Sequence, residues 1–74
     1  MKYTYEIIQK VWKKGNILGD FDENVYRRDD YGAWMMKDEY GNRSSRFGWE
    51  IERIDPNGGD DIENLKPVQW SNKK

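Results

Sequence analysis

The sequence contains neither cysteine nor histidine. Without cysteine the chain can form no disulfide and no thiolate zinc site, two devices that commonly stabilise small domains. Without histidine it lacks the side chain that most often serves as a general base near neutral pH. No apolar run is long enough for a signal peptide or a membrane span, so we expect a cytoplasmic location and no membrane partner.

Neither sign of charge dominates the sequence. Thirteen lysines and arginines stand against fourteen aspartates and glutamates, for a net charge of −1. This balance gives no general attraction to a polyanion, so nucleic-acid binding would depend on local patches. Because the sequence also lacks a basic stripe, a protein partner is slightly favoured, and DNA stays open as the alternative.

The length of 74 residues suits one domain and is too short for two separate cores. With no disulfide to stabilise the chain, aromatic side chains must supply much of the buried surface. The sequence has four Trp, five Tyr and two Phe, and we expect most of them in the core rather than on a surface platform.

Apolar side chains spaced three and four residues apart, from Tyr5 to Trp12, follow one face of a helix. Thr4 can cap the start of this helix, and Gly15 can adopt the left-handed conformation that ends it. The pattern predicts a helix from about Tyr5 to Lys14. An alternation of apolar residues near its start would also fit a strand, which stays open.

The middle of the chain predicts loops and one short strand. Three side chains have the alternate spacing that begins a calcium loop: Asp20, Asp22 and Asn24. The sixth and twelfth positions of that pattern hold Val25 and Tyr31 instead of glycine and glutamate, so residues 16–24 are interpreted as a solvated loop. Residues 32–37 are apolar enough for a strand.

The most informative stretch is Gly48 to Lys74, which reads GWEIERIDPNGGDDIENLKPVQWSNKK. A short strand pattern leads through a Pro-Asn-Gly-Gly turn to an end with helix-like apolar spacing. This stretch resembles the core of the HNH endonucleases, the ββα-metal nucleases, whose members commonly read GWEIDHI, a GG-containing loop and NL-PLQW. The likeness extends back to about Trp12, because residues 25–37 match a stretch often written WRKD-CG-WI.

The resemblance implies an α+β fold in one domain over residues 1–74, with its core motif at 48–74. In that fold the N-terminal helix is followed by a ββα-metal hairpin and a C-terminal helix. Asp60 and Asp61 would then cap the final helix ahead of Ile62.

The resemblance also marks the positions that carry the family's chemistry. The family has an Asp-His pair at the end of the first hairpin strand, where Asp helps hold a metal and His takes a proton from water. Here that pair is Glu52 and Arg53, and arginine has no acceptor and stays protonated. Asn64 matches the asparagine that fastens the hairpin loop. The last ligand position holds Lys73, or Asn72 if the alignment shifts by one.

The charges at these positions disfavour a metal. At ~4 Å and an effective dielectric of ~20, one unit charge and a divalent ion interact by roughly 8 kcal/mol. Glu52 would attract the ion, whereas Arg53 and Lys73 would each repel it. We therefore expect no metal and no other cofactor. Mg²⁺ or another divalent ion would be needed only by an enzyme with a rearranged site.

Six cations are candidates for contacts to phosphate or to a partner: Arg27, Arg28, Arg43, Arg46, Arg53 and Lys73. Arginine suits phosphate because it can donate two parallel hydrogen bonds. In a chain this highly charged, surface ion pairs of Arg53 with Glu50, Glu52 or Glu63 are the favoured alternative.

The leading functional hypothesis is a catalytically inactive HNH-like protein that acts by binding. It would be a small regulatory or inhibitory protein, of the kind that phages and mobile elements encode, acting on a nuclease or defence complex, or a DNA-binding accessory. The alternative is a metal-dependent endonuclease with a rearranged site. A third interpretation, suggested by the end at Lys74, is a packing module of a larger nuclease.

Overall fold

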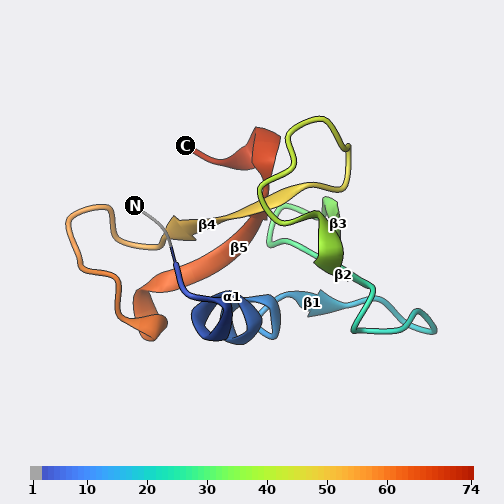
Figure 1. Ribbon diagram of the computed structural model, residues 1–74, viewed down its shortest axis with the longest axis horizontal. Helices are drawn as coiled ribbons and strands as arrows, with labels where there is room; N and C mark the ends of the chain where they lie inside the picture. Colours follow the sequence, from blue (N-terminus) through green and yellow to red (C-terminus); the bar gives the residue numbers. More distant parts are fainter. Residues whose placement is uncertain (1–2) are drawn as a thin grey trace.

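The computed structural model describes residues 3–74, which form one α-helix, two small antiparallel sheets and three 3-10 turns (Figure 1). The helix and strands are α1 (Tyr5–Trp12), β1 (Asn16–Ile17), β2 (Tyr26–Arg28), β3 (Trp34–Met36), β4 (Trp49–Arg53) and β5 (Leu65–Gln69). The 3-10 turns are Lys37–Glu39, Ile62–Asn64 and Trp70–Asn72. The α+β class predicted from the sequence is confirmed.

The helix α1 begins as predicted and ends two residues early. The Thr4 hydroxyl accepts a hydrogen bond from the Ile7 N–H at 3.2 Å, which caps the first turn. The chain then leaves the helix through a turn in which the Gly15 N–H donates to the Trp12 carbonyl at 3.0 Å. No helix among residues 3–74 has the length and apolar character needed to cross a membrane.

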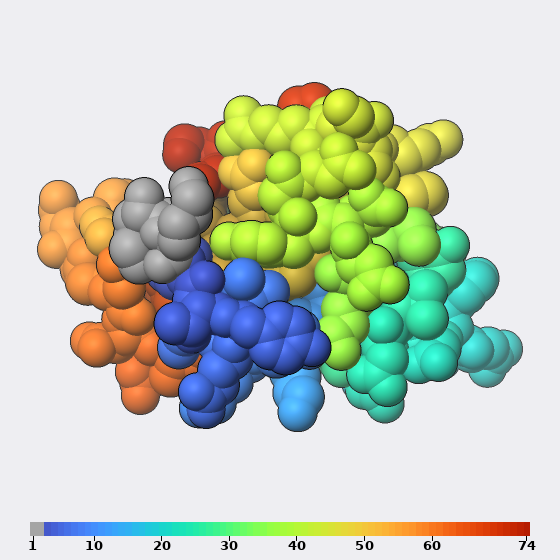
Figure 2. All heavy atoms as spheres, in the orientation of Figure 1, coloured from blue at the N-terminus to red at the C-terminus, as the bar shows by residue number. Residues whose placement is uncertain are grey.

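The first sheet has the strand order β1-β2-β3. Successive side chains of each strand point to opposite faces of the sheet, and this decides which of them are buried. Arg27 lies opposite Met35, and both face the interior. Tyr26 lies opposite Met36, and Arg28 lies opposite exposed Trp34. The loop that precedes β2 projects at one end of the molecule, where it is cyan and teal in Figure 2.

The second sheet pairs β4 with β5, from Trp49 opposite Gln69 to Arg53 opposite Leu65. The prediction of a C-terminal helix is therefore wrong, because Leu65 and Val68 belong to a strand and only the 3-10 turn Trp70–Asn72 follows it. Pro67 explains the difference. Proline has no N–H to donate inside a helix, and it disfavours the helical conformation of the residue before it.

The N-caps predicted for that helix are wrong as well. Asp61 precedes only the short 3-10 turn Ile62–Asn64, and its side chain makes no capping hydrogen bond. The Asp60 carboxylate accepts hydrogen bonds from Arg53 instead.

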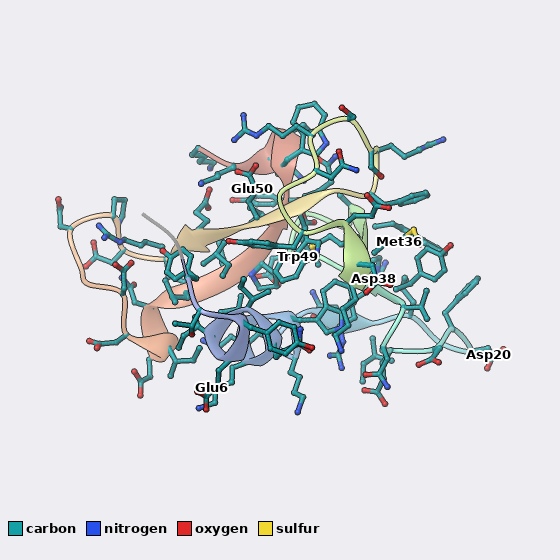
Figure 3. The ribbon with its side chains drawn as sticks, in the orientation of Figure 1. Glu6, Asp20, Met36, Asp38, Trp49 and Glu50 are labelled. Carbon is teal, nitrogen blue, oxygen red and sulfur yellow. The ribbon has the colours of Figure 1, made fainter. Side chains whose placement is uncertain are left out.

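The core lies between α1 and the two sheets, with Trp49 near the centre of the molecule (Figure 3). Its buried members are Val11, Trp12, Met35, Trp49, Ile51 and Leu65. The rings of Trp12 and Trp49 lie 5.2 Å apart, and each indole N–H donates to a backbone carbonyl. Among the aromatic residues of 3–74 these two alone are buried. The expectation that most aromatics lie in the core is wrong, because strands of two or three residues present few inward positions.

Candidate functional site

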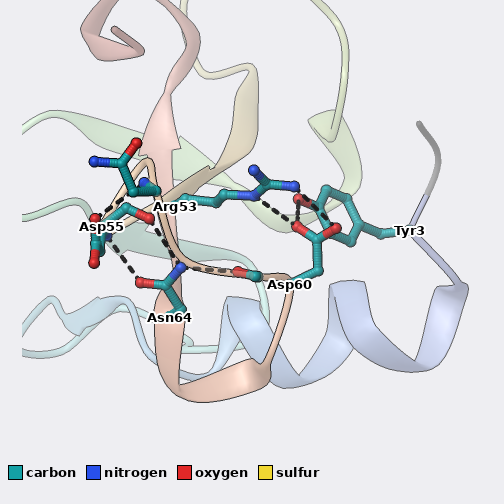
Figure 4. Close-up of polar contacts among 7 residues, drawn as sticks. Tyr3, Arg53, Asp55, Asp60 and Asn64 are labelled. Atoms are coloured by element: carbon teal, nitrogen blue, oxygen red, sulfur yellow. Dashed lines mark hydrogen bonds and ion pairs between the residues drawn. The ribbon is translucent and has the colours of Figure 1, made fainter.

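Asn64 fastens the loop between β4 and β5 (Figure 4). Its side-chain oxygen accepts from the Asp55 N–H at 2.8 Å, and its amide nitrogen donates to the carbonyls of Asp55 and Gly59 at 3.0 and 2.8 Å. A Cβ at Gly58 would lie 2.7 Å from that nitrogen, so the bare glycine lets the asparagine reach the loop. This is the structural role that the sequence predicts for Asn64.

Arg53, which the resemblance aligns with the general base of the HNH nucleases, is paired with Asp60. Its Nε and Nη2 donate to the two carboxylate oxygens at 2.9 and 3.2 Å, and the Tyr3 hydroxyl donates to the same carboxylate at 3.0 Å (Figure 4). Hydrogen bonds from Arg53 and then Tyr3 lower the pKa of Asp60, and the hydrogen bond to Asp60 raises the pKa of Arg53. Arg53 thus forms a surface ion pair, and the partner is across the loop rather than one of the predicted glutamates.

Glu50 forms ion pairs with two of the other candidate cations. Arg43 donates to its carboxylate from Nε at 2.6 Å and from Nη2 at 2.8 Å, and Lys73 Nζ lies 3.4 Å from Oε1. The hydrogen bonds from Arg43 hold the pKa of Glu50 below its ordinary value, and the charge of Lys73 adds to that effect. Lys73 therefore points toward a carboxylate of β4.

Glu52 also has two partners, one cation and one backbone amide. Its carboxylate lies 3.9 Å from Lys66 Nζ, directly across the hairpin, and accepts a hydrogen bond from the Lys74 N–H at 2.7 Å. Within residues 3–74, no three acidic side chains gather in a way that could hold a metal ion. A divalent ion at Glu52 would face Lys66 and, nearby, Arg53 and Lys73, so these residues do not fit one.

A groove of about 680 Å³ opens beside these ion pairs. The charged and aromatic side chains that line it include Tyr31, Glu52, Arg53, Lys66, Lys73 and Lys74. The ammonium groups of Lys66 and Lys74 lie 5.2 and 5.6 Å from the centre of the Tyr31 ring, within cation–π range. Of these six lining residues, four are cations and one is a carboxylate.

The remaining candidate cations lie elsewhere. Arg27 is only 6% exposed and donates to the carbonyls of Lys13, Gly15 and Glu23 and to the Glu23 carboxylate. The Arg27 guanidinium binds backbone carbonyls just after the end of α1. The side chain is therefore not on the surface, where a phosphate or a partner could contact it. Arg28 and Arg46 are exposed and form no ion pair within residues 3–74. The six candidates thus do not form one site.

The sequence alone does not identify Tyr31, Lys66 and Lys74 as neighbours in a groove. The helix-like apolar spacing of residues 62–70 conceals the strand that places Lys66 opposite Glu52. No protein-family model matches the chain, and no curated protein or solved structure matches it significantly. The resemblance to the HNH nucleases therefore depends on the residues quoted above.

Proposed function

We propose that the protein is a catalytically inactive, HNH-like binding protein that regulates or inhibits another protein. The observation that carries this proposal is the pairing of Arg53 with Asp60. The family needs a proton acceptor at that position, whereas a guanidinium has only donors and remains charged. Here the donors are also directed at a neighbouring carboxylate, which fixes the cation in place.

The hairpin loop next to Arg53, and the groove beside that loop, support a binding role. Asn64 holds the hairpin loop with three hydrogen bonds, so the surface beside the loop has a defined shape. The groove next to it combines aromatic, aliphatic and charged side chains, a composition typical of protein contact surfaces.

The ion pairs favour a protein partner over DNA. Arg53 is matched by Asp60, Arg43 and Lys73 by Glu50, and Lys66 by Glu52. A phosphate backbone would have to displace these carboxylates or lie beside them, at a cost in repulsion. A protein surface with both signs of charge can accommodate them. A role for phages or mobile elements, on a nuclease or defence complex, is part of the proposal and comes from the resemblance.

A DNA-binding accessory is the second candidate, favoured by one observation. Lys66 and Lys74 both lie over the ring of Tyr31, where a phosphate could meet two ammonium groups near an exposed aromatic face. The metal-dependent endonuclease with a rearranged site remains the enzyme alternative, and Glu52 would be its ligand.

Plasmid cleavage separates the binding proposal from the enzyme alternative. Supercoiled plasmid is incubated with the protein and Mg²⁺, Mn²⁺, Ni²⁺ or Zn²⁺, and we expect no nicking with any of them. Metal-dependent nicking that disappears in the Glu52→Ala variant would establish the nuclease instead.

Binding is tested with the purified protein as bait in a cell extract. The matched control is the Lys66→Ala/Lys74→Ala variant, which leaves the fold's buried residues untouched. A partner retained by the wild type and lost by the variant supports the groove as the binding surface. A parallel titration with labelled duplex at several salt concentrations distinguishes DNA: saturable, salt-dependent binding that the variant loses would favour the accessory.

A further inference from the structure

Four aromatic side chains, here called the aromatic patch, cover the outer face of the first sheet: Phe21, Tyr26, Trp34 and Phe47. Their rings meet edge to face, with centres 5.1 to 5.9 Å apart. Phe21 is 51% exposed and Trp34 is 37% exposed. None of the four belongs to the buried core cluster, so this is a second apolar assembly that lies at the surface.

The indole of Trp34 differs from the other three in its hydrogen bonding. Trp12, Trp49 and Trp70 each donate the indole N–H to a backbone carbonyl. Within residues 3–74 the Trp34 indole N–H has no such partner. Tryptophans with an apolar body and an unused donor at the surface are enriched at protein interfaces. A contiguous apolar surface of this kind marks an interaction site.

Charges are distributed unevenly around the aromatic patch. The loop before β2 places Asp20 and Asp22 next to Phe21 in the sequence, and Figure 3 shows Asp20 at the outer tip of that loop. At the other end, the Arg46 guanidinium lies 5.6 Å from the centre of the Phe47 ring. In Figure 2 the cyan loop and the yellow segment near residue 46 project from the same side of the molecule at different heights. Asp20 and Asp22 therefore flank the Phe21 end of the patch and Arg46 flanks the Phe47 end, while Arg28 is exposed opposite Trp34 on the same face of the sheet.

We propose that a second copy of the chain covers the aromatic patch in a two-fold symmetric dimer. A two-fold axis through Tyr26 and Trp34 would bring Arg46 of each copy toward Asp20 and Asp22 of the other. Interfaces with two-fold symmetry must be complementary to themselves, and a patch with opposite charges at its two ends meets that requirement. The dimer does not depend on the proposed regulatory function and adds to it.

The same charges disfavour nucleic acid as the occupant. A single strand stacked on these rings would carry its phosphates past Asp20 and Asp22, where like charges repel. The edge-to-face packing also covers part of each ring, which leaves less face for a base. A stable interface buries about 800 Å² of accessible surface on each partner. That is about a sixth of the 4955 Å² of surface that the protein exposes. An interface of that size would need surface beyond the four partly exposed rings, so we expect a weak dimer.

Sedimentation equilibrium over about 1 μM to about 1 mM protein, which brackets the affinity of a small interface, tests the dimer. The expected mass rises from the monomer's 8.9 kDa toward twice that value. Trp34→Ala should weaken the association at least about tenfold, as loss of a central aromatic residue does. Tyr5→Ala is the matched control, because Tyr5 is 76% exposed on α1, and it should leave the mass unchanged.

Charge exchange gives a sharper test that does not depend on how Trp34→Ala folds. Arg46→Asp and Asp20→Arg should each weaken self-association, because each puts like charges together across the two-fold axis. An equimolar mixture of the two variants should associate more strongly than either variant alone, because residue 46 of one copy and residue 20 of the other are then opposite in sign at both ends of the interface, with Asp22 unchanged in each. Glu63→Arg, on the far hairpin loop, is the control for net charge. A monomer at every concentration, or a dimer that none of the patch variants weakens, would overturn the proposal.

Discussion

Asp29, in the turn after β2, accepts a hydrogen bond from the backbone N–H of Gln69, forty residues further along the chain, at 2.9 Å. The same carboxylate accepts from Tyr31 N–H, Ala33 N–H and the Asn72 amide at 2.8 to 3.0 Å. Asp29 is 2% exposed, so its carboxylate is shielded from water and depends on these four donors. One buried side chain therefore ties the first sheet to the end of the second.

The structure predicts that Asp29→Ala strongly destabilises the fold. Four N–H groups would lose their acceptor inside the protein, and hydrogen bonds to a charged group contribute about 1.5–3 kcal/mol each when considered singly. Because the four share one carboxylate, we expect a total loss of about 3–5 kcal/mol in the free energy of unfolding. Urea unfolding measures it. Asp38→Ala is the control, since Asp38 is exposed, and a loss as small as the control's would contradict the role of Asp29.

Asn64→Ala should destabilise the loop between β4 and β5. The substitution leaves the Asp55 N–H and the carbonyls of Asp55 and Gly59 without their partners, which costs about 1–3 kcal/mol. Hydrogen exchange of the loop amides should accelerate along with the loss of stability. Asn57→Ala provides the comparison in the same loop, because only its backbone N–H takes part in a hydrogen bond. Equal effects of the two substitutions would show that the Asn64 side chain does not hold the loop.

Local patterns in the sequence predict the parts of the fold that are determined by residues close together in the chain. Thr4 and the apolar spacing after it specify α1, and the apolar run before Lys37 specifies β3. The interactions that fix the candidate site link residues far apart in the chain. Asp60 meets Arg53 across a loop, and Asp29 meets Gln69 across the molecule, so neither partner can be inferred from spacing alone.

The error at the end of the chain has a different origin. Ile62, Leu65 and Val68 recur every three residues, which fits a helix, but Leu65 and Val68 are buried from an extended strand. The constraint imposed by Pro67 was present in the sequence and outweighs that spacing.

Arg53→Ala should leave the affinity for duplex DNA unchanged. Its guanidinium is occupied by Asp60, so it does not act as an unmatched phosphate contact. Fluorescence anisotropy with a labelled duplex at several salt concentrations measures both the affinity and its salt dependence. A phosphate contact would instead reveal itself as weaker binding and a salt slope smaller by about one unit. Asp60→Ala is the companion variant, because releasing Arg53 should increase any DNA binding.

Stability should decrease in mild acid because of Glu50. Arg43 lowers the pKa of this carboxyl in the folded protein, with a smaller contribution from Lys73, whereas the unfolded chain has an ordinary glutamate pKa. A lowered folded pKa means that the unfolded state binds the proton more readily, so stability is full above the unfolded pKa and is lost as the pH falls through the folded one.

The Arg43→Ala variant isolates this contribution. The variant retains Lys73 but loses the two hydrogen bonds from Arg43, so its Glu50 pKa should return toward the ordinary range. The free energy of unfolding of the wild type should exceed that of the variant at neutral pH, and the difference should shrink over the acid range below the ordinary glutamate pKa, as Glu50 protonates. Urea unfolding across that range measures both curves. A difference that stays constant with pH would mean that Arg43 stabilises the protein by packing rather than through the charge of Glu50.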